Sequence, residues 1–191
     1  LQGVSKRYAW TVFALIVALM LSDYMSRSVI NAVLPDLKTM LGVDEAQLGL
    51  LIFMTPIAAI SAMLVAPAFG AAMGRAALPL AVLLMALAFM LPGQASVWWL
   101  FPLAMACAGA ATGLTDVLMN ARVAALENER KLHLMNLCHA AYSFGYAGGA
   151  LATGAMRGAE WRPAWVMGTC AALALAMVVL TLEADGRIDG L

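Results

Sequence analysis

An all-α membrane protein is the fold class that this sequence predicts, and three observations predict it. Hydrophobic residues make up 64% of the chain and charged residues only 12%, against roughly half and a quarter in a soluble domain. The chain has 191 residues, which is too few to bury so large an apolar share away from water. The apolar residues also gather in runs of about 18 residues or more, the length that crosses a bilayer. A soluble globular fold is therefore excluded.

Six apolar segments, separated by short polar or Pro- and Gly-containing stretches, predict six transmembrane helices. Segments this long and evenly apolar exclude the strands of a membrane barrel. We expect one transmembrane domain over 1–182 and a polar cytoplasmic linker over 183–191. Because the chain begins at Leu1 and closes on this linker, we expect it to be cut from a longer protein. The predicted spans are about 8–34 (stopping at Pro35), 47–70, 76–91, 98–126, 134–156 and 162–182.

Loop charge predicts that both termini lie in the cytoplasm, because Lys and Arg concentrate on that side. Seven such residues then lie inside and three lie outside. The tryptophans agree, since Trp98, Trp99, Trp161 and Trp165 mark one interface and Trp10 marks the other. The inside residues are Lys6, Arg7, Arg75, Arg122, Arg130, Lys131 and Arg187, and the outside residues are Lys38, Arg157 and Arg162.

Several classes of function find no support in the residues. Acidic and basic residues balance at 11 each, so no net charge attracts nucleic acid. Cys107, Cys138 and Cys170 have no metal-site or disulfide spacing and are expected to pack between helices. No Ser/His, paired-aspartate or zinc-ligand pattern indicates catalysis. We therefore expect no enzyme, no cofactor and no metal, and we expect a lipid bilayer as the surroundings.

The first predicted helix carries Asp23, Arg27 and Asn31 on successive turns and therefore on one face. An ionisable side chain inside the bilayer costs roughly 2.5 to 3.5 kcal/mol, so each one calls for a reason. A cavity-facing arginine would meet an anionic or polyhydroxy solute with its forked donors. Alternatively, Asp23 and Arg27 neutralise each other, or the arginine reaches outward to the interface.

The fourth and fifth predicted helices carry two further polar sets. Asp116 and Asn120 are one turn apart on the fourth helix, where burial favours the neutral acid and makes Asp116 a candidate proton carrier. Alternatively, Asp116 only joins its helix to a neighbour. His139, Tyr142 and Tyr146, with Ser143 between them, form one stripe on the fifth helix that suits a sugar-like or carboxylate ligand. His139 is either a proton relay or a structural donor.

Pairs of small residues on the same two helices predict close helix packing. Gly109 and Gly113 lie four residues apart on the fourth helix, and Gly145 and Gly149 do so on the fifth. Such pairs let two helix backbones approach each other. They would also let helices rock without interlocked side chains, which a transporter needs.

These features together resemble the amino-terminal half of a major facilitator superfamily transporter. The first helix and its following loop, from Asp23 to Gly49, are similar to organic-anion symporters of that superfamily, in which an arginine at the position of Arg27 contacts the substrate. The stretches 113–120 and 139–145 are more similar to the fucose:proton symporter group, which has an acid four residues before an asparagine. The resemblance implies a bacterial inner membrane and a second six-helix half, from the same chain beyond Leu191 or from another chain.

One motif departs from the superfamily's pattern. The loop between the second and third helices usually reads Gly-x-x-x-Asp-Arg-x-Gly-Arg, and here Gly70 and Arg75 fit it. Gly74 stands in place of the aspartate, and Ala77 and Leu78 replace the later glycine and arginine. This loss favours an alternative function, a non-transporting scaffold or assembly factor.

The sequence therefore predicts proton-coupled secondary transport of a small polar solute, either a sugar or an organic anion. Substrate contacts are assigned to Arg27, Asp23, Asn31, Tyr142 and Tyr146. Proton coupling is assigned to Asp116, Asn120 and His139. The alternatives are a multidrug-type efflux transporter, which the missing glycine-proline motif on the fifth helix disfavours, and the scaffold.

Overall fold

The computed structural model describes residues 28–182, except 29 and 132, and this part of the chain is all-helical, as predicted. Residues 30–41 form the end of a first helix. Five complete α-helices follow, which are α2 (Glu45–Met73), α3 (Ala77–Met90), α4 (Leu100–Arg130), α5 (Met135–Gly158) and α6 (Pro163–Val178). Short 3₁₀ turns cover Gly74–Ala76, Pro92–Gln94 and Val179–Thr181. These helices occupy the second to sixth predicted segments, with shifted ends.

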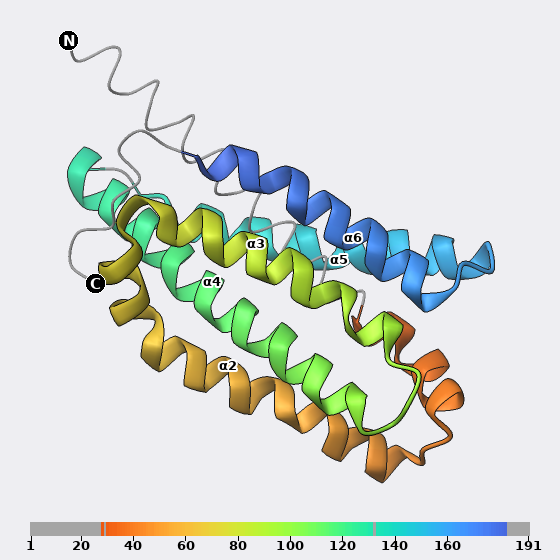
Figure 1. Cartoon of the computed structure of the whole chain (residues 1–191). Helices are drawn as coiled ribbons and strands as arrows, with labels where there is room; N and C mark the ends of the chain where they lie inside the picture. Colours follow the sequence, from red (N-terminus) through yellow and green to blue (C-terminus); the bar gives the residue numbers. More distant parts are fainter. Residues whose placement is uncertain (1–27, 29, 132, 183–191) are drawn as a thin grey trace.

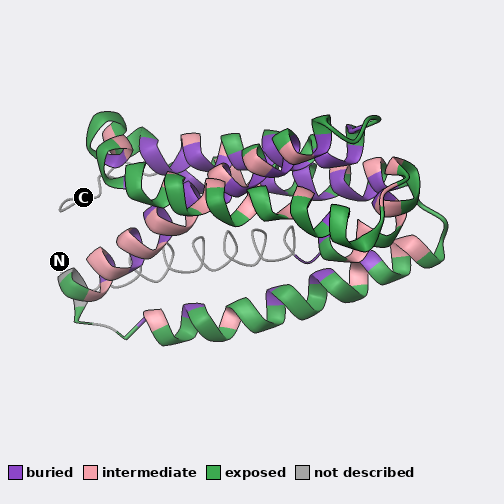
Figure 2. Ribbon diagram, turned by 90° about the horizontal axis from the view of Figure 1, so that it is seen from below, coloured by how far each residue is buried: buried purple, intermediate pink, exposed green. Residues whose placement is uncertain are grey.

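The helices form a layer with one helix behind it. α2, α4, α3 and α6 lie side by side in this order, and each contacts its neighbour (Figure 1). α5 lies behind this layer and contacts α4 (Figures 1 and 2). Most of α5 is exposed, and its buried residues Cys138, Gly145, Gly149 and Thr153 lie along one side (Figure 2).

The first helix continues beyond its predicted end. We predicted a stop at Pro35, whereas residues 30–41 are helical through this proline. Proline removes only its own N–H from the hydrogen-bond ladder, and helices of membrane proteins tolerate it where neighbouring groups compensate. The helix ends instead at Gly42, whose positive φ of 66° suits glycine.

α2 begins earlier than predicted because its first turn is capped. The Asp44 side chain accepts from the Gln47 backbone N–H at 2.7 Å, and the Gln47 side chain accepts from the Asp44 N–H at 2.9 Å. This reciprocal pair satisfies two of the N–H groups that a helix start leaves without partners. Lys38 and Glu45 form an ion pair at 3.0 Å across the same turn.

α2 and α4 pack backbone against backbone. A Cβ atom on Gly109 would lie 2.2 Å from the Thr55 carbonyl oxygen, and one on Gly113 would lie 2.3 Å from that of Ala59. No side chain larger than hydrogen fits at either glycine without moving a helix. Gly109 and Gly113 therefore form the close contact that their spacing predicts.

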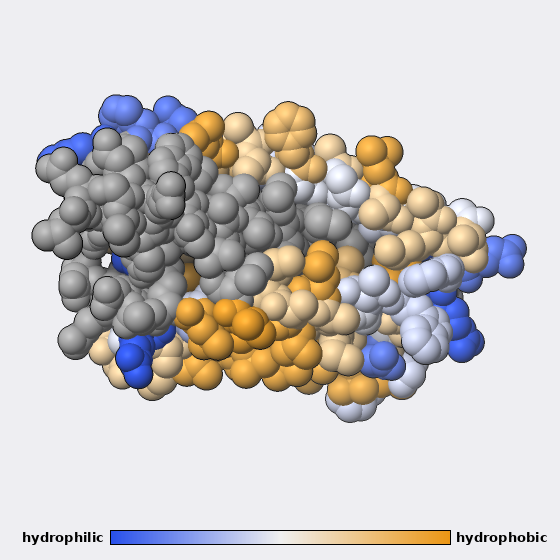
Figure 3. Space-filling view, turned by 90° about the horizontal axis from the view of Figure 1, so that it is seen from above, coloured by the Kyte–Doolittle hydropathy of each residue, from blue (hydrophilic) through white to orange (hydrophobic). Residues whose placement is uncertain are grey.

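Apolar residues fill the interior and also cover much of the outside. The core contains large, fully buried side chains such as Phe89, Phe101, Met85, Met105 and Met167. On the face in Figure 3, hydrophobic residues lie between hydrophilic residues at the two ends of the molecule. The segments Glu45–Gln94 and Leu100–Asn128 contain helices long and apolar enough to cross a membrane, and α6 is a shorter apolar helix. α5 is not among these described segments, because polar residues such as His139, Tyr142 and Tyr146 lower its mean hydropathy.

Candidate functional site

Two polar side chains that were predicted to lie on different helices meet in the structure. The Asn31 side-chain amide Nδ2 donates a hydrogen bond to the Tyr146 hydroxyl at 2.9 Å. The two residues are 115 positions apart in the chain, so the bond joins the first helix to α5. Both side chains are exposed in this part of the protein. The bond therefore forms a polar surface that faces away from the core.

The polar surface continues along α5. The ring centres of Tyr142 and Tyr146 lie 6.4 Å apart at an interplanar angle of 36°. His139 and Ser143 are exposed on the same stripe. The buried side of α5 adjoins this stripe, so packing holds the helix while its hydroxyls and imidazole remain accessible.

A second contact joins the same two elements nearer to their ends. Arg157 Nη2 forms an ion pair with the Asp36 carboxylate, and Nη1 donates to the Trp161 carbonyl oxygen at 2.7 Å. The Asp36 and Arg157 side chains are 31% and 29% exposed. Together with the bond between Asn31 and Tyr146, this pair sets the register of residues 30–41 against α5.

The residues predicted to couple proton movement do not share one environment, because two are half-buried on α4 and one is exposed on α5. Asp116 and Asn120 are half-buried on consecutive turns of α4. Asn120 Nδ2 donates to the backbone carbonyl of Asp116 at 2.9 Å, so this bond supports the helix and does not reach the carboxylate. His139 lies on the exposed stripe of α5. Asp23 and Arg27 lie outside the described residues.

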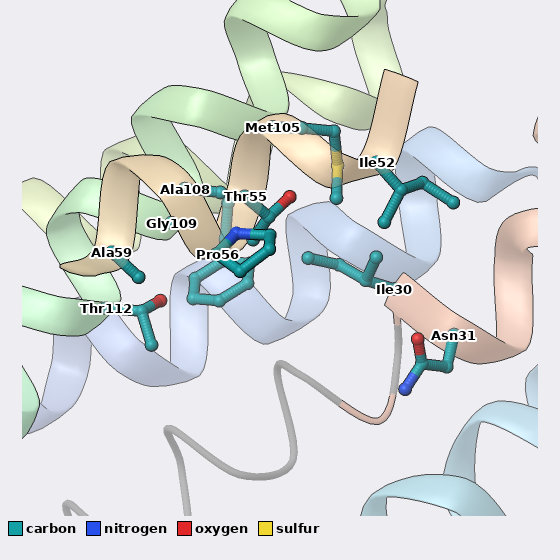
Figure 4. A pocket seen from close by; sticks show the side chains of 11 residues that line it. Ile30, Asn31, Ile52, Thr55, Pro56, Ala59, Met105, Ala108, Gly109 and Thr112 are labelled. Carbon is teal, nitrogen blue, oxygen red and sulfur yellow. The ribbon is translucent and has the colours of Figure 1, made fainter. Parts of the chain in front are cut away.

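A cavity of about 310 Å³ opens beside Asn31 (Figure 4). It lies between residues 30–41, α2, α3 and α4, and most of its lining is apolar. Asn31 belongs both to this lining and to the hydrogen bond with Tyr146. The cavity is thus continuous with the polar surface.

Sequence reasoning missed the places of two charged residues. Arg122 was counted among the inside charges although it lies within the predicted span 98–126, and it is 3% exposed inside α4, so that count falls from seven to six against three. Glu127 Oε1 accepts from the backbone N–H groups of Leu134 and Met135, at 2.5 and 3.0 Å, and caps the start of α5. The predicted span 98–126 already passed Arg122, and α4 continues to Arg130.

The described residues contain no group of three or more His, Cys, Asp or Glu side chains able to hold a metal ion. The family model of the Major Facilitator Superfamily matches residues 16–187, which is most of the chain. No curated protein matches the chain.

Proposed function

Because the chain belongs to the Major Facilitator Superfamily, we propose that it is the amino-terminal six-helix half of a proton-coupled transporter for a small polar solute, a sugar or an organic anion. Membership alone makes the chain an integral membrane protein of a transporter family. The solute class, the proton coupling and the total of six helices belong to the proposal.

The hydrogen bond between Asn31 and Tyr146 is the single observation that carries this proposal. Polar side chains in membrane proteins generally face a partner or a water-filled cavity, because burial in lipid is costly. Here an amide and a phenol from two helices meet on an exposed stripe that also carries Tyr142 and His139. An uncharged set of donors and acceptors suits the hydroxyls of a sugar or the oxygens of a carboxylate.

Proton coupling is assigned to Asp116, with Asn120 and His139 as its supporting residues. Asp116 is half-buried on α4, one helical turn before Asn120. Arg27, with Asp23 on the same face of the predicted first helix, is assigned to the anionic part of the solute. These roles follow from the sequence pattern and remain part of the proposal.

We assign the exposed apolar surface of α2 to a second six-helix half and to lipid. Leu50, Phe53, Ile60 and Leu64 are each at least 60% exposed along this helix. Superfamily transporters enclose a site near the middle of the membrane between two halves that rock about it. The proposed location is a bacterial inner membrane with both termini in the cytoplasm.

Solute-driven proton uptake into proteoliposomes tests the proposal. The full-length protein is reconstituted with a pH-sensitive dye inside, and a panel of monosaccharides and monocarboxylates is added outside. We expect at least one solute to acidify the interior and Tyr146→Phe to weaken this response. Thr169→Ala is the matched control, because this exposed hydroxyl lies on α6, outside the polar surface, and donates to the Trp165 carbonyl at 2.9 Å.

Asp116→Asn separates coupling from transport. We expect this variant to lose uphill, proton-driven uptake and to keep exchange of solute across the membrane. Intact uphill uptake in Asp116→Asn would contradict the role of Asp116. A panel in which no solute moves protons would contradict proton symport itself.

A further inference from the structure

The cavity beside Asn31 has the character of a pocket for an apolar group. Its walls include Ile30, Ile52, Met105 and Phe89, and no charged residue belongs to the described lining. Figure 4 shows Ile30, Ile52 and Met105 on residues 30–41, α2 and α4, with Asn31 at one side. A charged group would lose its hydration against these described walls. The chemistry of the lining therefore selects an uncharged, mostly apolar occupant.

The cavity volume limits the size of that occupant. Its 310 Å³ lies at the lower end of ligand pockets, which begin at about 300 Å³. An apolar cavity of about 150 Å³ already binds benzene. The space therefore suits one aromatic ring with short substituents.

The wall on α2 offers hydrogen-bonding groups that the helix does not use. Ser61, Thr115 and Thr169 each donate to the carbonyl four residues earlier, at 2.8 to 2.9 Å. The buried Thr55 hydroxyl, in contrast, has no partner among the described residues. The next residue is Pro56, which has no N–H to give to the Ile52 carbonyl. Thr55 and Ile52 both line the cavity, but the Thr55 hydroxyl itself is buried, so the apolar walls define the occupant.

The cavity cannot close by a simple approach of α2 to α4. The two backbones already touch where Thr55 faces Gly109 and where Ala59 faces Gly113. Three of these four residues, Thr55, Ala59 and Gly109, also line the cavity. Because the two backbones already touch at the glycines, α2 and α4 cannot move closer together to fill the neighbouring cavity.

We propose that this cavity receives an uncharged apolar substituent of the transported solute, about one aromatic ring in size, while the polar part of the solute lies on Asn31 and Tyr146. This inference rests on the proposed function, because it extends the same site. It names the substrate class as amphipathic solutes, either aryl glycosides or aryl carboxylates, in place of simple sugars or short acids.

Cysteine labelling of the full-length protein tests the size of the pocket. Cys107, Cys138 and Cys170 are replaced by alanine, and Thr112→Cys is introduced in the cavity wall, where Thr112 is 8% exposed. We expect benzyl methanethiosulfonate to label this variant and the larger pyrenyl reagent to react about tenfold more slowly, because overpacking is costly. The control Leu175→Cys, 48% exposed on α6 outside the cavity, should react with both reagents at similar rates.

Protection by solute pairs tests the occupant. Methyl and phenyl β-glucopyranoside form one pair, and propionate and 3-phenylpropionate form the other. We expect the phenyl member of at least one pair to slow benzyl labelling of Thr112→Cys, and its partner to leave labelling unchanged. Equal rates with the pyrenyl reagent, absence of benzyl labelling, or absence of protection by both phenyl solutes would overturn the proposal.

Two further measurements distinguish a solute pocket from a general effect of phenyl solutes and from a lipid site. In the protein with its native cysteines, Ala59→Leu fills the cavity and should remove the extra rise in Tm that a phenyl solute gives, while Ile60→Phe keeps it. An equal rise in both variants would contradict the pocket.

Slow benzyl labelling in lipid nanodiscs without solute would assign the cavity to a lipid chain and also contradict it. If phenyl solutes protect but drive no proton uptake, the pocket stands and the proposed proton symport fails.

Discussion

The contact between α2 and α4 and the contact between residues 30–41 and α5 depend on different kinds of interaction. The first is made by Gly109 and Gly113 against the backbone of α2, with no side chain between the helices. The second is made by side chains, namely the hydrogen bond of Asn31 with Tyr146 and the ion pair of Asp36 with Arg157. Shape determines the first contact and polar chemistry the second.

The largest loss of stability is expected from Gly109→Ala, which breaks the shape-determined contact. Its new Cβ would lie 2.2 Å from the Thr55 carbonyl oxygen, so the helices must separate, at a cost of about 1–3 kcal/mol. Thermal melting of the purified protein measures the loss. Gly148→Ala on α5 is the control, because a Cβ there meets nothing within 4 Å. Equal melting temperatures for the two variants would contradict the close contact.

Glu127→Ala removes the cap that joins the end of α4 to the start of α5. Because Glu127 accepts from the Leu134 and Met135 N–H groups, its loss should weaken the start of α5, as for other helix caps. Hydrogen exchange of these two amides should become faster. Glu127→Gln keeps an acceptor oxygen and should retain part of the protection. Unchanged exchange in Glu127→Ala would show that the capping contact does not persist in solution.

A double-mutant cycle of Asp36→Asn and Arg157→Gln isolates the ion pair on the polar contact. Both side chains are about 30% exposed, so the coupling energy should be about 0.5–1 kcal/mol. It should fall as salt is raised, because ions screen exposed charges. The effect of Gly109→Ala should not depend on salt. Equal salt dependence of the two effects would erase the distinction between the contacts.

The smallest loss of stability is expected from Tyr146→Phe. Removing one hydrogen bond between helices in a membrane protein costs about 0.6 kcal/mol. The change in Tm should therefore be slight, while the solute response falls clearly. A large loss of stability with unchanged transport would make the bond structural and not functional.

The fold of the described part was predictable because membrane helices follow directly from apolar runs. The ends of the helices were harder to predict, since they depend on local chemistry. Pro35 suggested a stop, yet the helix continues to residue 41. Arg122 was counted among the inside charges, yet it is buried within α4, which continues to Arg130. A charge or a proline marks the end of an apolar run in the sequence but does not by itself end a helix.

The site was predictable residue by residue but not as an arrangement. Helical spacing placed Asn31 on one polar face and Tyr146 on another, and nothing in the spacing showed that the two faces meet. The ion pair of Asp36 with Arg157 spans 121 positions, and only the packing of the helices brings its partners together. The cavity depends on the space that several helices leave between them, which no single segment encodes.

The affinity of the solute that drives proton uptake tests the central claim most directly. It is measured for the native protein, for Asn31→Ala, for Tyr146→Phe and for the double variant. If both residues hold one solute as a bonded pair, each single change should weaken binding about tenfold, and the double change should weaken it little further. Native affinity in all three variants would contradict the claim that this polar surface binds the solute.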